Sequence, residues 1–346
     1  MSYNFRQIVK PLLSWYDKNG RSLPWREEPT PYHVWVSEIM LQQTRVEAVR
    51  EYYKRFLEAL PRVEDLANAS EDEILKLWEG LGYYNRVRNM QLAAKTVVKE
   101  YDGKIPADYE VLLTLKGIGN YTAGAISSIA YGKQVPAVDG NVLRVMKRLS
   151  GSYDDISKDK VKKDMERELR KVVPKRAGAF NQAVMDLGAM ICIPNGEPLC
   201  DKCPLKKFCE ARKHGIQNEL PIKAKKKPRK IEEKTILILE CDGNIAVRKR
   251  AAKGLLAGLW EFPSVEGKMS KKELEKVFSE EGWQVEISEM GESIHIFSHI
   301  EWHMIGFRVK LKEQIRKEEY TWVSVSELKE KYAIPTAFQA YTKQIL

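Results

Sequence analysis

The sequence predicts a multidomain protein in which an all-α half is followed by an α+β domain, and three observations support this division. Through residues 4–212, apolar side chains recur at three- and four-residue spacing, the period of an amphipathic helix. Residues 235–346 contain short apolar runs bounded by turn residues, which is typical of strands. Between the two regions, residues 223–230 read KAKKKPRK, six basic residues in eight. With 346 residues, the chain is long enough for two separate cores.

The all-α half is predicted from runs of helical periodicity joined by short loops rich in Gly, Pro and Asp. No run in this half alternates as a strand would. The predicted helical runs are 34–49, 71–79, 87–101, 121–131, 140–149 and 159–173.

The second half shows a different periodicity. Residues 235–250, TILILECDGNIAVRKR, predict two strands joined by a turn at Asp242-Gly243. Further strands are expected in the stretches WEFPSV and IHIFSHIEWHMIGFRVKL, and helices over 270–281 and 326–332. The predicted domains are therefore a helical domain over 1–212, a basic linker over 213–234 and an α+β domain over 235–346.

Charge points to the class of partner. The net charge is +10 and the isoelectric point about 9.1, which favours a polyanionic partner such as nucleic acid. No uncharged apolar run approaches the roughly 20 residues of a membrane span. The first 20 residues also lack the basic start and apolar core of a signal peptide. We therefore expect an intracellular protein of the cytoplasm with no membrane partner and with reduced cysteines.

Four of the five cysteines fall within 18 residues, in the order Cys192, Cys200, Cys203 and Cys209. The spacing C-x7-C-x2-C-x5-C predicts a shared metal centre in the loop 192–209. A structural zinc site usually has two short C-x2-C pairs, and only one is present here. The spacing therefore favours an iron–sulfur cluster with four thiolate ligands over zinc, with zinc as the alternative. Cys241 stands alone in a predicted strand and is expected in a core.

The stretch LKGIGNYTA, residues 115–123, predicts a tight turn between two helices. Gly117 and Gly119 allow positive φ angles and the close approach of a ligand to the backbone. Free N–H groups at the start of the next helix are suited to bind a phosphate without reading base sequence. An ordinary helix–helix turn is the alternative. Lys116 lies within this turn, and an exposed turn offers nothing to depress its pKa for nucleophilic catalysis.

Two carboxylates occur in settings that suit different protonation states. Glu38 lies in the helical stretch WVSEIMLQQT between apolar residues, which should raise its pKa. Asp139 begins the helical stretch VDGNVLRV, where the helix dipole and free N–H groups favour a carboxylate anion. A turn of the GxG type, an aspartate about 20 residues later and a four-cysteine loop follow one another in this order.

This order resembles the helix–hairpin–helix DNA glycosylases that carry an iron–sulfur cluster. The stretches LPWR (23–26), SEIMLQQT (37–44), GLGYYNR (80–86), AVDGNV (137–142) and FNQAVMDLGAMIC (180–192) are similar to the MutY-type adenine DNA glycosylases of that superfamily. The resemblance extends over nearly the whole chain. It implies an all-α helix–hairpin–helix glycosylase domain with a [4Fe-4S] loop, plus a Nudix-like C-terminal domain.

The resemblance implies a monofunctional glycosylase of base excision repair. Adenine is a poor leaving group as an anion, so one protonated acid and one ionised carboxylate are needed. Glu38 would protonate adenine N7 and Asp139 would stabilise the oxocarbenium ion, with Tyr121 and Asn141 as supporting residues. Bifunctional relatives carry a Schiff-base lysine two residues past the second hairpin glycine, where this chain has Tyr121.

The resemblance also implies residues that contact DNA and the flipped base. Base flipping is helped by side chains that fill or wedge a base step. The DNA-binding and intercalating positions are Gln43, Thr44, Tyr83, Lys116, Gly117 and Gly119. A core role for the aromatic residues is the alternative. The adenine pocket would comprise Arg21, Leu23, Trp25, Arg26 and Gln182.

The C-terminal domain is similar to the Nudix-like domain with which the family inspects the opposite base. Its helix SKKELEKVFSEEG, residues 270–282, lacks the full glutamate-and-arginine box of a Nudix hydrolase, so hydrolase activity is not expected. Phe297, Ser298 and His299 match the loop that would recognise 8-oxoguanine, with a plain strand end as the alternative. Ser298 could accept a hydrogen bond from the N7–H that distinguishes 8-oxoguanine from guanine.

The expected partner is double-stranded DNA with adenine opposite 8-oxoguanine or guanine, bound by a monomer in the bacterial nucleoid. One departure from the family is the spacing of seven residues, in place of the usual six, between Cys192 and Cys200; we expect a bulge around Asn195-Gly196. Two alternatives are an endonuclease III-like bifunctional glycosylase/lyase and a non-catalytic mismatch-binding protein. Tyr121 and the long C-terminal domain disfavour the first, and the pair Glu38 and Asp139 disfavours the second.

Overall fold

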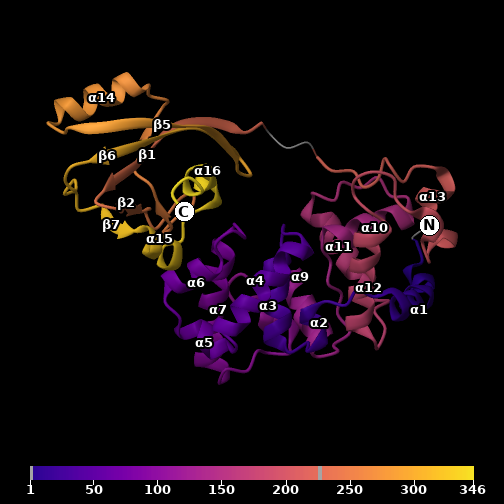
Figure 1. Cartoon of the computed structure of the whole chain (residues 1–346). Coiled ribbons are helices and arrows are strands. Elements are labelled where there is room, and N and C mark those ends of the chain that lie inside the picture. The colour runs from indigo at the N-terminus through magenta and orange to yellow at the C-terminus, as the bar shows by residue number, and fades with distance from the viewer. Residues whose placement is uncertain (1–2, 225–227) are drawn as a thin grey trace. The chain divides into compact units, whose positions relative to one another are not determined.

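The computed structural model describes residues 3–224 and 228–346, and the chain divides into two compact units. The helical unit comprises residues 1–68 and 86–225, and the sheet unit comprises residues 69–85 and 226–346 (Figure 1). The predicted fold class, a helical first half and a sheet-containing second half, is confirmed. The centre of the predicted basic linker, 225–227, lies outside the described residues.

One segment groups differently from its position in the sequence. Residues 69–85 lie within the predicted helical domain 1–212, but in the structure they form part of the sheet unit. This segment contains helix α6 (Glu71–Leu77) and the GLGYYN loop.

The helical unit consists of short α-helices connected by loops. Several begin at a side chain that accepts a backbone N–H of the first turn, among them Thr30, Asp108 and Asp139. The α-helices are α1 (Val9–Asn19), α2 (Pro24–Glu27), α3 (Pro31–Leu41), α4 (Val46–Ala59), α5 (Val63–Asn68), α7 (Asn85–Tyr101), α8 (Tyr109–Thr114), α9 (Asn120–Ala125), α10 (Gly140–Ser150), α11 (Asp159–Arg170), α12 (Ala177–Met190) and α13 (Glu210–His214).

The predicted continuous run 34–49 is wrong, because a turn separates α3 from α4. Gln43, in that turn, has a φ of 61°, which no α-helix accommodates. Arg45 is extended and precedes α4. The predicted run 121–131 has a second irregularity, since α9 continues as a π-helical turn over Ile126–Ala130.

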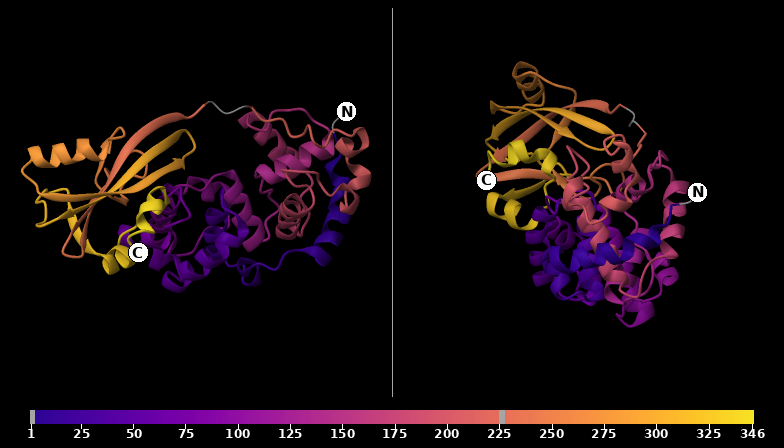
Figure 2. Two further views of the ribbon diagram at one scale, coloured as in Figure 1. Left: turned by 45° about the horizontal axis from the view of Figure 1, so that its top comes forward. Right: turned by 90° about the vertical axis from the view of Figure 1, so that its right-hand side faces the viewer.

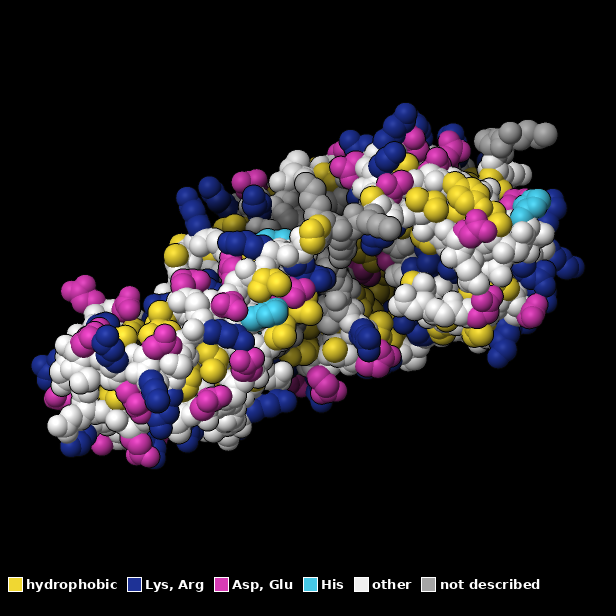
Figure 3. Space-filling model, turned by 90° about the horizontal axis from the view of Figure 1, so that it is seen from above, with side chains coloured by type: hydrophobic (Ala, Val, Ile, Leu, Met, Phe, Trp, Pro, Cys, Tyr) yellow, Lys and Arg dark blue, Asp and Glu magenta, His cyan; other side chains and the backbone are white. Residues whose placement is uncertain are grey.

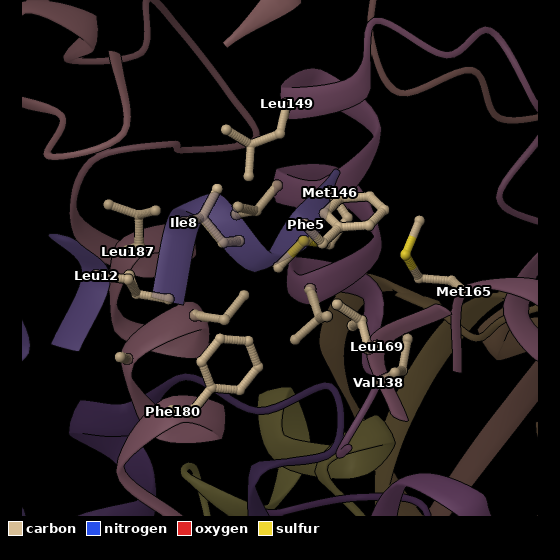
Figure 4. Close-up of a cluster of buried hydrophobic side chains, with 14 of the residues drawn as sticks. Phe5, Ile8, Leu12, Val138, Met146, Leu149, Met165, Leu169, Phe180 and Leu187 are labelled. Carbon is tan, nitrogen blue, oxygen red and sulfur yellow. The ribbon is translucent and has the colours of Figure 1, made fainter. Parts of the chain in front are cut away.

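The core that supports the candidate site lies between α1, α10, α11 and α12 (Figure 4). Ile8, Leu12, Met146 and Phe180 are completely buried in it. Three of the four clustered cysteines, Cys192, Cys203 and Cys209, pack against its edge. This core therefore fixes the N-terminus of α10 and the cysteine loop relative to each other.

The sheet unit contains a seven-stranded mixed sheet with the order β3-β2-β1-β6-β5, in which β4 also pairs with β1 and β7 with β2. The long strands of the sheet can be followed in Figure 2. Strands β1 and β6 are parallel, and the other pairs are antiparallel. The strands are β1 (Lys230–Cys241), β2 (Asn244–Lys249), β3 (Trp260–Glu261), β4 (Ser264–Glu266), β5 (Val285–Ile296), β6 (Ile300–Leu311) and β7 (Thr321–Ser324).

Both faces of this sheet are covered. Ile236 and Ile238 of β1 point to one core, and Leu237, Leu239 and Cys241 to the other, as the two-residue period of a strand requires. Helix α14 (Lys271–Glu280) covers the second face. The first face is covered by α15 (Val325–Lys331), the turn Thr336–Phe338 and α16 (Gln339–Thr342).

None of the described helices combines the length and apolar character that a membrane span requires. Figure 3 shows Lys and Arg side chains interspersed with Asp and Glu over the face in view, so neither sign of charge dominates that face.

Candidate active site

A cavity of about 1050 Å³ opens in the helical unit and brings together most of the predicted site residues of that unit. All four predicted catalytic residues line this cavity. Glu38 lies on α3 and Tyr121 on α9, while Asp139 immediately precedes α10 and Asn141 lies in its first turn. Gln43 and Thr44, predicted to contact DNA, line the same cavity. So do all the predicted adenine-pocket residues, which are Arg21, Leu23, Trp25, Arg26 and Gln182.

Glu38 is buried on α3, a helix with apolar residues on all sides, and only 5% of its surface is exposed. Burial raises the pKa of its carboxyl to about 7, and the nearby charge of Asp139 adds to the rise. Tyr121 donates its hydroxyl hydrogen to Glu38 Oε2, which partly opposes the shift, as does the positive charge of Arg26. A carboxyl with this pKa can hold a proton at neutral pH and release it to a bound base.

Asp139 is the N-cap of α10. Its Oδ1 accepts the Val142 backbone N–H at 2.7 Å, and its Oδ2 accepts Asn141 Nδ2 at 2.9 Å. Burial raises the pKa of Asp139, and these two hydrogen bonds, together with the charge of Arg144, oppose the rise. Each carboxylate oxygen of Asp139 thus accepts a hydrogen bond, an arrangement that stabilises the ionised form.

A chain of hydrogen bonds connects Asp139 to the cysteine loop. Asn141 donates to Asp139, and Arg144 Nη2 donates to Asn141 Oδ1 at 2.8 Å. Arg144 Nε in turn donates to the carbonyl oxygen of Cys192 at 2.9 Å. Arg144 is itself buried, and its hydrogen bond to Asn141 Oδ1 fixes the orientation of the Asn141 amide.

In the hairpin preceding α9, only the first of the two glycines has a positive φ, because Gly119 is extended with a φ of −99°. Gly117 has a φ of 79°, and a Cβ atom there would lie 2.6 Å from Asn89 Cβ, so glycine is required. A Cβ at Gly119 would meet no atom within 4 Å, which leaves the N-terminus of α9 open. Lys116 is exposed in the turn and is not among the residues that line the cavity.

The pocket wall around Arg26 depends on Asp186, which sequence reasoning did not assign to the site. Asp186 is completely buried on α12 and accepts four hydrogen bonds at 2.8–3.0 Å, two from Arg21 and two from Arg26. Gln182, one turn earlier, accepts the hydroxyl of Tyr16 at 3.2 Å. The sequence feature that could have identified Asp186 is its position as a single acid in an otherwise apolar helix, which is also the feature that identified Glu38.

The predicted residues for the opposite base belong to the sheet unit. The hydroxyl oxygen of Tyr83 lies 3.4 Å from Ser298 Oγ, and Tyr83 has a φ of 50° and is 49% exposed. Phe297 packs edge-on against Trp302 at 4.9 Å between ring centroids, which anchors the 297–299 loop. His299 is exposed.

The four clustered cysteines line a second, small cavity of about 30 Å³ in the helical unit. Arg148 Nη1 lies 3.4 Å from Cys192 Sγ, and the thiol of Cys209 donates to the carbonyl oxygen of Arg148. Among the described residues, no three His, Cys, Asp or Glu side chains are grouped closely enough to hold a single metal ion.

The loop between Cys192 and Cys200 closes on itself. Leu199 N–H donates to the Ile191 carbonyl at 2.9 Å, and Gly196 has a φ of 76°. Pro194 and Asn195 reach the large cavity and form part of its lining.

Family models match most of the two units. A model described as "HhH-GPD superfamily base excision DNA repair protein" matches residues 36–174, and a NUDIX domain model matches residues 235–344. A solved structure of a thermostable thymine-DNA glycosylase is 29% identical with a TM-score of 0.55, covering 60% of this chain and 97% of that one. A non-covalent endonuclease III–DNA complex is 25% identical with a TM-score of 0.53, covering 61% and 96%.

Curated relatives match over both units. The adenine DNA glycosylase of Homo sapiens is 38% identical over 351 residues, covering 84% of this chain and 64% of the human protein. That of Buchnera aphidicola subsp. Schizaphis graminum is 34% identical over 315 residues, covering 89% of this chain and 88% of the relative. This chain therefore spans less than two thirds of the human protein but most of the bacterial one. Together with the two matched domains, these likenesses show that the chain belongs to the adenine DNA glycosylase family.

Proposed function

We propose that this protein is a monofunctional glycosylase of base excision repair that removes adenine opposite 8-oxoguanine or guanine. The observation that carries the proposal is the pairing of a buried, protonatable Glu38 with a hydrogen-bonded Asp139 at one cavity. Curated relatives named adenine DNA glycosylase support the choice of base.

In the proposed reaction Glu38 donates its proton to N7 of the flipped adenine as the bond from the base to the sugar breaks. The electrons of that bond leave with the base, which departs neutral because it has been protonated. Asp139 stabilises the positive charge that develops on the sugar and helps to place the attacking water. Asn141 holds one oxygen of Asp139 and thereby orients its carboxylate.

Strand cleavage through a lysine adduct is not part of the proposed reaction. Among the described residues that line the large cavity, the cations are Arg21, Arg26 and Arg45, and none is lysine. Tyr121 occupies the position after the hairpin and bonds Glu38. Arginine stays protonated and cannot serve as the nucleophilic amine.

The DNA partner is proposed to bind in two places. The open N-terminus of α9 after Gly119, beside Lys116, suits a backbone phosphate. The pair Tyr83 and Ser298 suits the opposite base, with Tyr83 wedging the base step and Ser298 accepting the N7–H of 8-oxoguanine. We propose that the protein acts as a monomer.

A [4Fe-4S] cluster is proposed to be held by Cys192, Cys200, Cys203 and Cys209. The residues fit, because four thiols surround one cavity and a cubane cluster takes four thiolate ligands. When bound, the cluster would supply four iron–thiolate bonds that cross-link the loop to the end of α12. Arg148 would lie against the Cys192 sulfur.

The test uses a duplex with one adenine opposite 8-oxoguanine, with adenine release and strand breakage measured in the same samples. The expected result is adenine release with strand breakage only after hot alkali. Breakage without alkali, abolished in Lys116→Ala, would instead support the bifunctional glycosylase/lyase. Tight binding of the duplex without adenine release would support the non-catalytic mismatch-binding protein.

A further inference from the structure

The segment that carries Tyr83 is attached to the C-terminal part of the chain by polar contacts of two side chains. Ile334 N–H donates to Glu79 Oε1 at 2.7 Å, and Lys76 Nζ donates to the Tyr332 carbonyl at 3.0 Å. Lys76 and Glu79 also bond each other at 2.6 Å. We refer to these four residues as the latch. They join positions more than 250 residues apart in the sequence.

The backbone that the latch contacts, residues 332–335, is fixed by contacts of its own within the sheet unit. Residues 332–335 lie in neither a helix nor a strand, so their N–H and C=O groups need partners from elsewhere. Trp260 N–H donates to the Ala333 carbonyl, and the Trp260 ring packs edge-on against Tyr332. Ile334 is buried in the sheet core. Glu79 therefore accepts the N–H of a buried residue in a part of the sheet unit that other contacts hold in place.

On the other side of the latch, a tightly turned loop leads from Glu79 to Tyr83. Gly80, Gly82 and Tyr83 all have positive φ angles, of 99°, 70° and 50°. Trp78 Nε1 donates to the Gly82 carbonyl at 3.1 Å and closes this turn. A displacement of Glu79 would therefore be passed on to Tyr83, whose hydroxyl oxygen lies 3.4 Å from Ser298 Oγ.

We propose that Glu79 is a positioning residue for recognition of the opposite base, because its latch keeps Tyr83 in register with Ser298. This inference rests on the proposed function, in which these two residues read the opposite base. In this proposal Glu79 contacts neither base and acts only through the loop. Its loss should weaken the discrimination between 8-oxoguanine and guanine more than it weakens the excision of adenine.

A second polar contact of the segment 69–85 with the rest of the sheet unit provides a matched control. Lys249 Nζ lies 2.8 Å from Asp72 of α6, but both side chains are more than 40% exposed. Exposed ion pairs contribute little because water screens them. Asp72→Asn therefore removes the negative charge of this ion pair from the same segment and leaves the bond from Ile334 N–H to Glu79 in place.

The experiment measures single-turnover excision of adenine opposite 8-oxoguanine and opposite guanine for the wild type, Glu79→Ala, Glu79→Gln and Asp72→Asn. The ratio of the two rate constants is expected to fall at least tenfold in Glu79→Ala, equal to about 1.4 kcal/mol. Glu79→Gln keeps an acceptor for Ile334 N–H but no charge for Lys76, so its ratio should be intermediate. Asp72→Asn should remain within twofold of the wild type.

Amide hydrogen exchange at Ile334 supplies a readout that is independent of catalysis. Exchange should accelerate in Glu79→Ala and stay unchanged in Asp72→Asn. The proposal is overturned if the rate ratio or the Ile334 exchange of Glu79→Ala matches the wild type, or if both rate constants fall in the same proportion. A wild type that releases no adenine would overturn the proposed function itself. A wild type that excises adenine equally fast from both duplexes would overturn the assignment of Tyr83 and Ser298 to the recognition of 8-oxoguanine.

Discussion

Tyr121 donates its hydroxyl hydrogen to Glu38 Oε2, and the two side chains meet at the cavity of the helical unit. This bond favours the charged form of Glu38, whereas burial favours the protonated form and is the larger effect. The balance leaves a carboxyl with a pKa of about 7 beside a second carboxylate, Asp139, that accepts two hydrogen bonds. Two acids in unlike environments are what acid-assisted glycosidic cleavage requires.

Replacing Glu38 with Gln should abolish most of the excision. Gln keeps the shape of the side chain but cannot donate a carboxylic proton, and a general acid contributes about 10²- to 10⁴-fold in rate. We expect the single-turnover rate of adenine release to fall by about that factor while affinity for the duplex changes little. Glu47→Gln, an exposed acid of α4, is the control and should retain the wild-type rate. An active Glu38→Gln variant would exclude Glu38 as the acid.

The pH dependence of excision should report the pKa of Glu38. An acid catalyst is active while protonated, so kcat/KM should be high below about pH 7 and fall as pH rises through the pKa of about 7. Tyr121→Phe removes a hydrogen bond to the charged form, which should raise the Glu38 pKa. The falling limb of the profile in this variant should therefore move to higher pH. A limb that stays in place or moves to lower pH would contradict the assignment.

Asp186→Asn should destabilise the helical unit strongly. Asp186 is completely buried, and its two arginine partners are 25% and 14% exposed in their side chains. Removing one charge from a buried ion pair costs about 3 kcal/mol, because the remaining charges lose their partner. Urea unfolding should show this decrease in the free energy of unfolding. Asp17→Asn, which breaks the exposed pair of Asp17 with Arg176, should change it little. Equal effects of the two variants would contradict the prediction.

Cys203→Ser should lower the iron content of the purified protein. The wild type is expected to carry about four iron atoms and about four sulfides per chain, as a cubane cluster has. Cys241→Ser is the matched control, because Cys241 is buried in the sheet core and is not part of the cysteine loop. Iron and acid-labile sulfide analysis distinguishes the outcomes. Zinc in place of iron in the wild type, or full iron in Cys203→Ser, would refute the proposed cluster.

Short-range patterns in the sequence were sufficient to predict the two-part fold class. Helical and strand periodicity are local properties, because each side chain's direction follows from its own few neighbours. The turn at Gly117, the N-cap at Asp139 and the four-cysteine spacing are local as well. The resemblance to the glycosylases added Tyr121, Asn141 and the pocket residues, and the structure places all of these on one cavity or directly behind it.

Local sequence patterns did not predict features that depend on a single turn or on a contact between residues far apart in the sequence. The run 34–49 keeps helical periodicity across the turn at Gln43, so the break between α3 and α4 was not visible. Asp186 occupies a helix position like many others in the sequence, and its partners Arg21 and Arg26 are 165 and 160 residues away. The pairing of Glu79 with Ile334 joins residues that are still farther apart in the sequence, by 255 positions.

The sequence by itself determined the class of each half, the order of the motifs and the residue types available for acid catalysis and metal binding. Only the tertiary structure decided that residues 69–85 join the sheet unit, that Asp186 supports the pocket and that the Glu38 pKa rises to about 7. The physical reason is that burial and electrostatic interaction depend on all the atoms around a group. Most of those atoms come from parts of the chain that local periodicity does not connect.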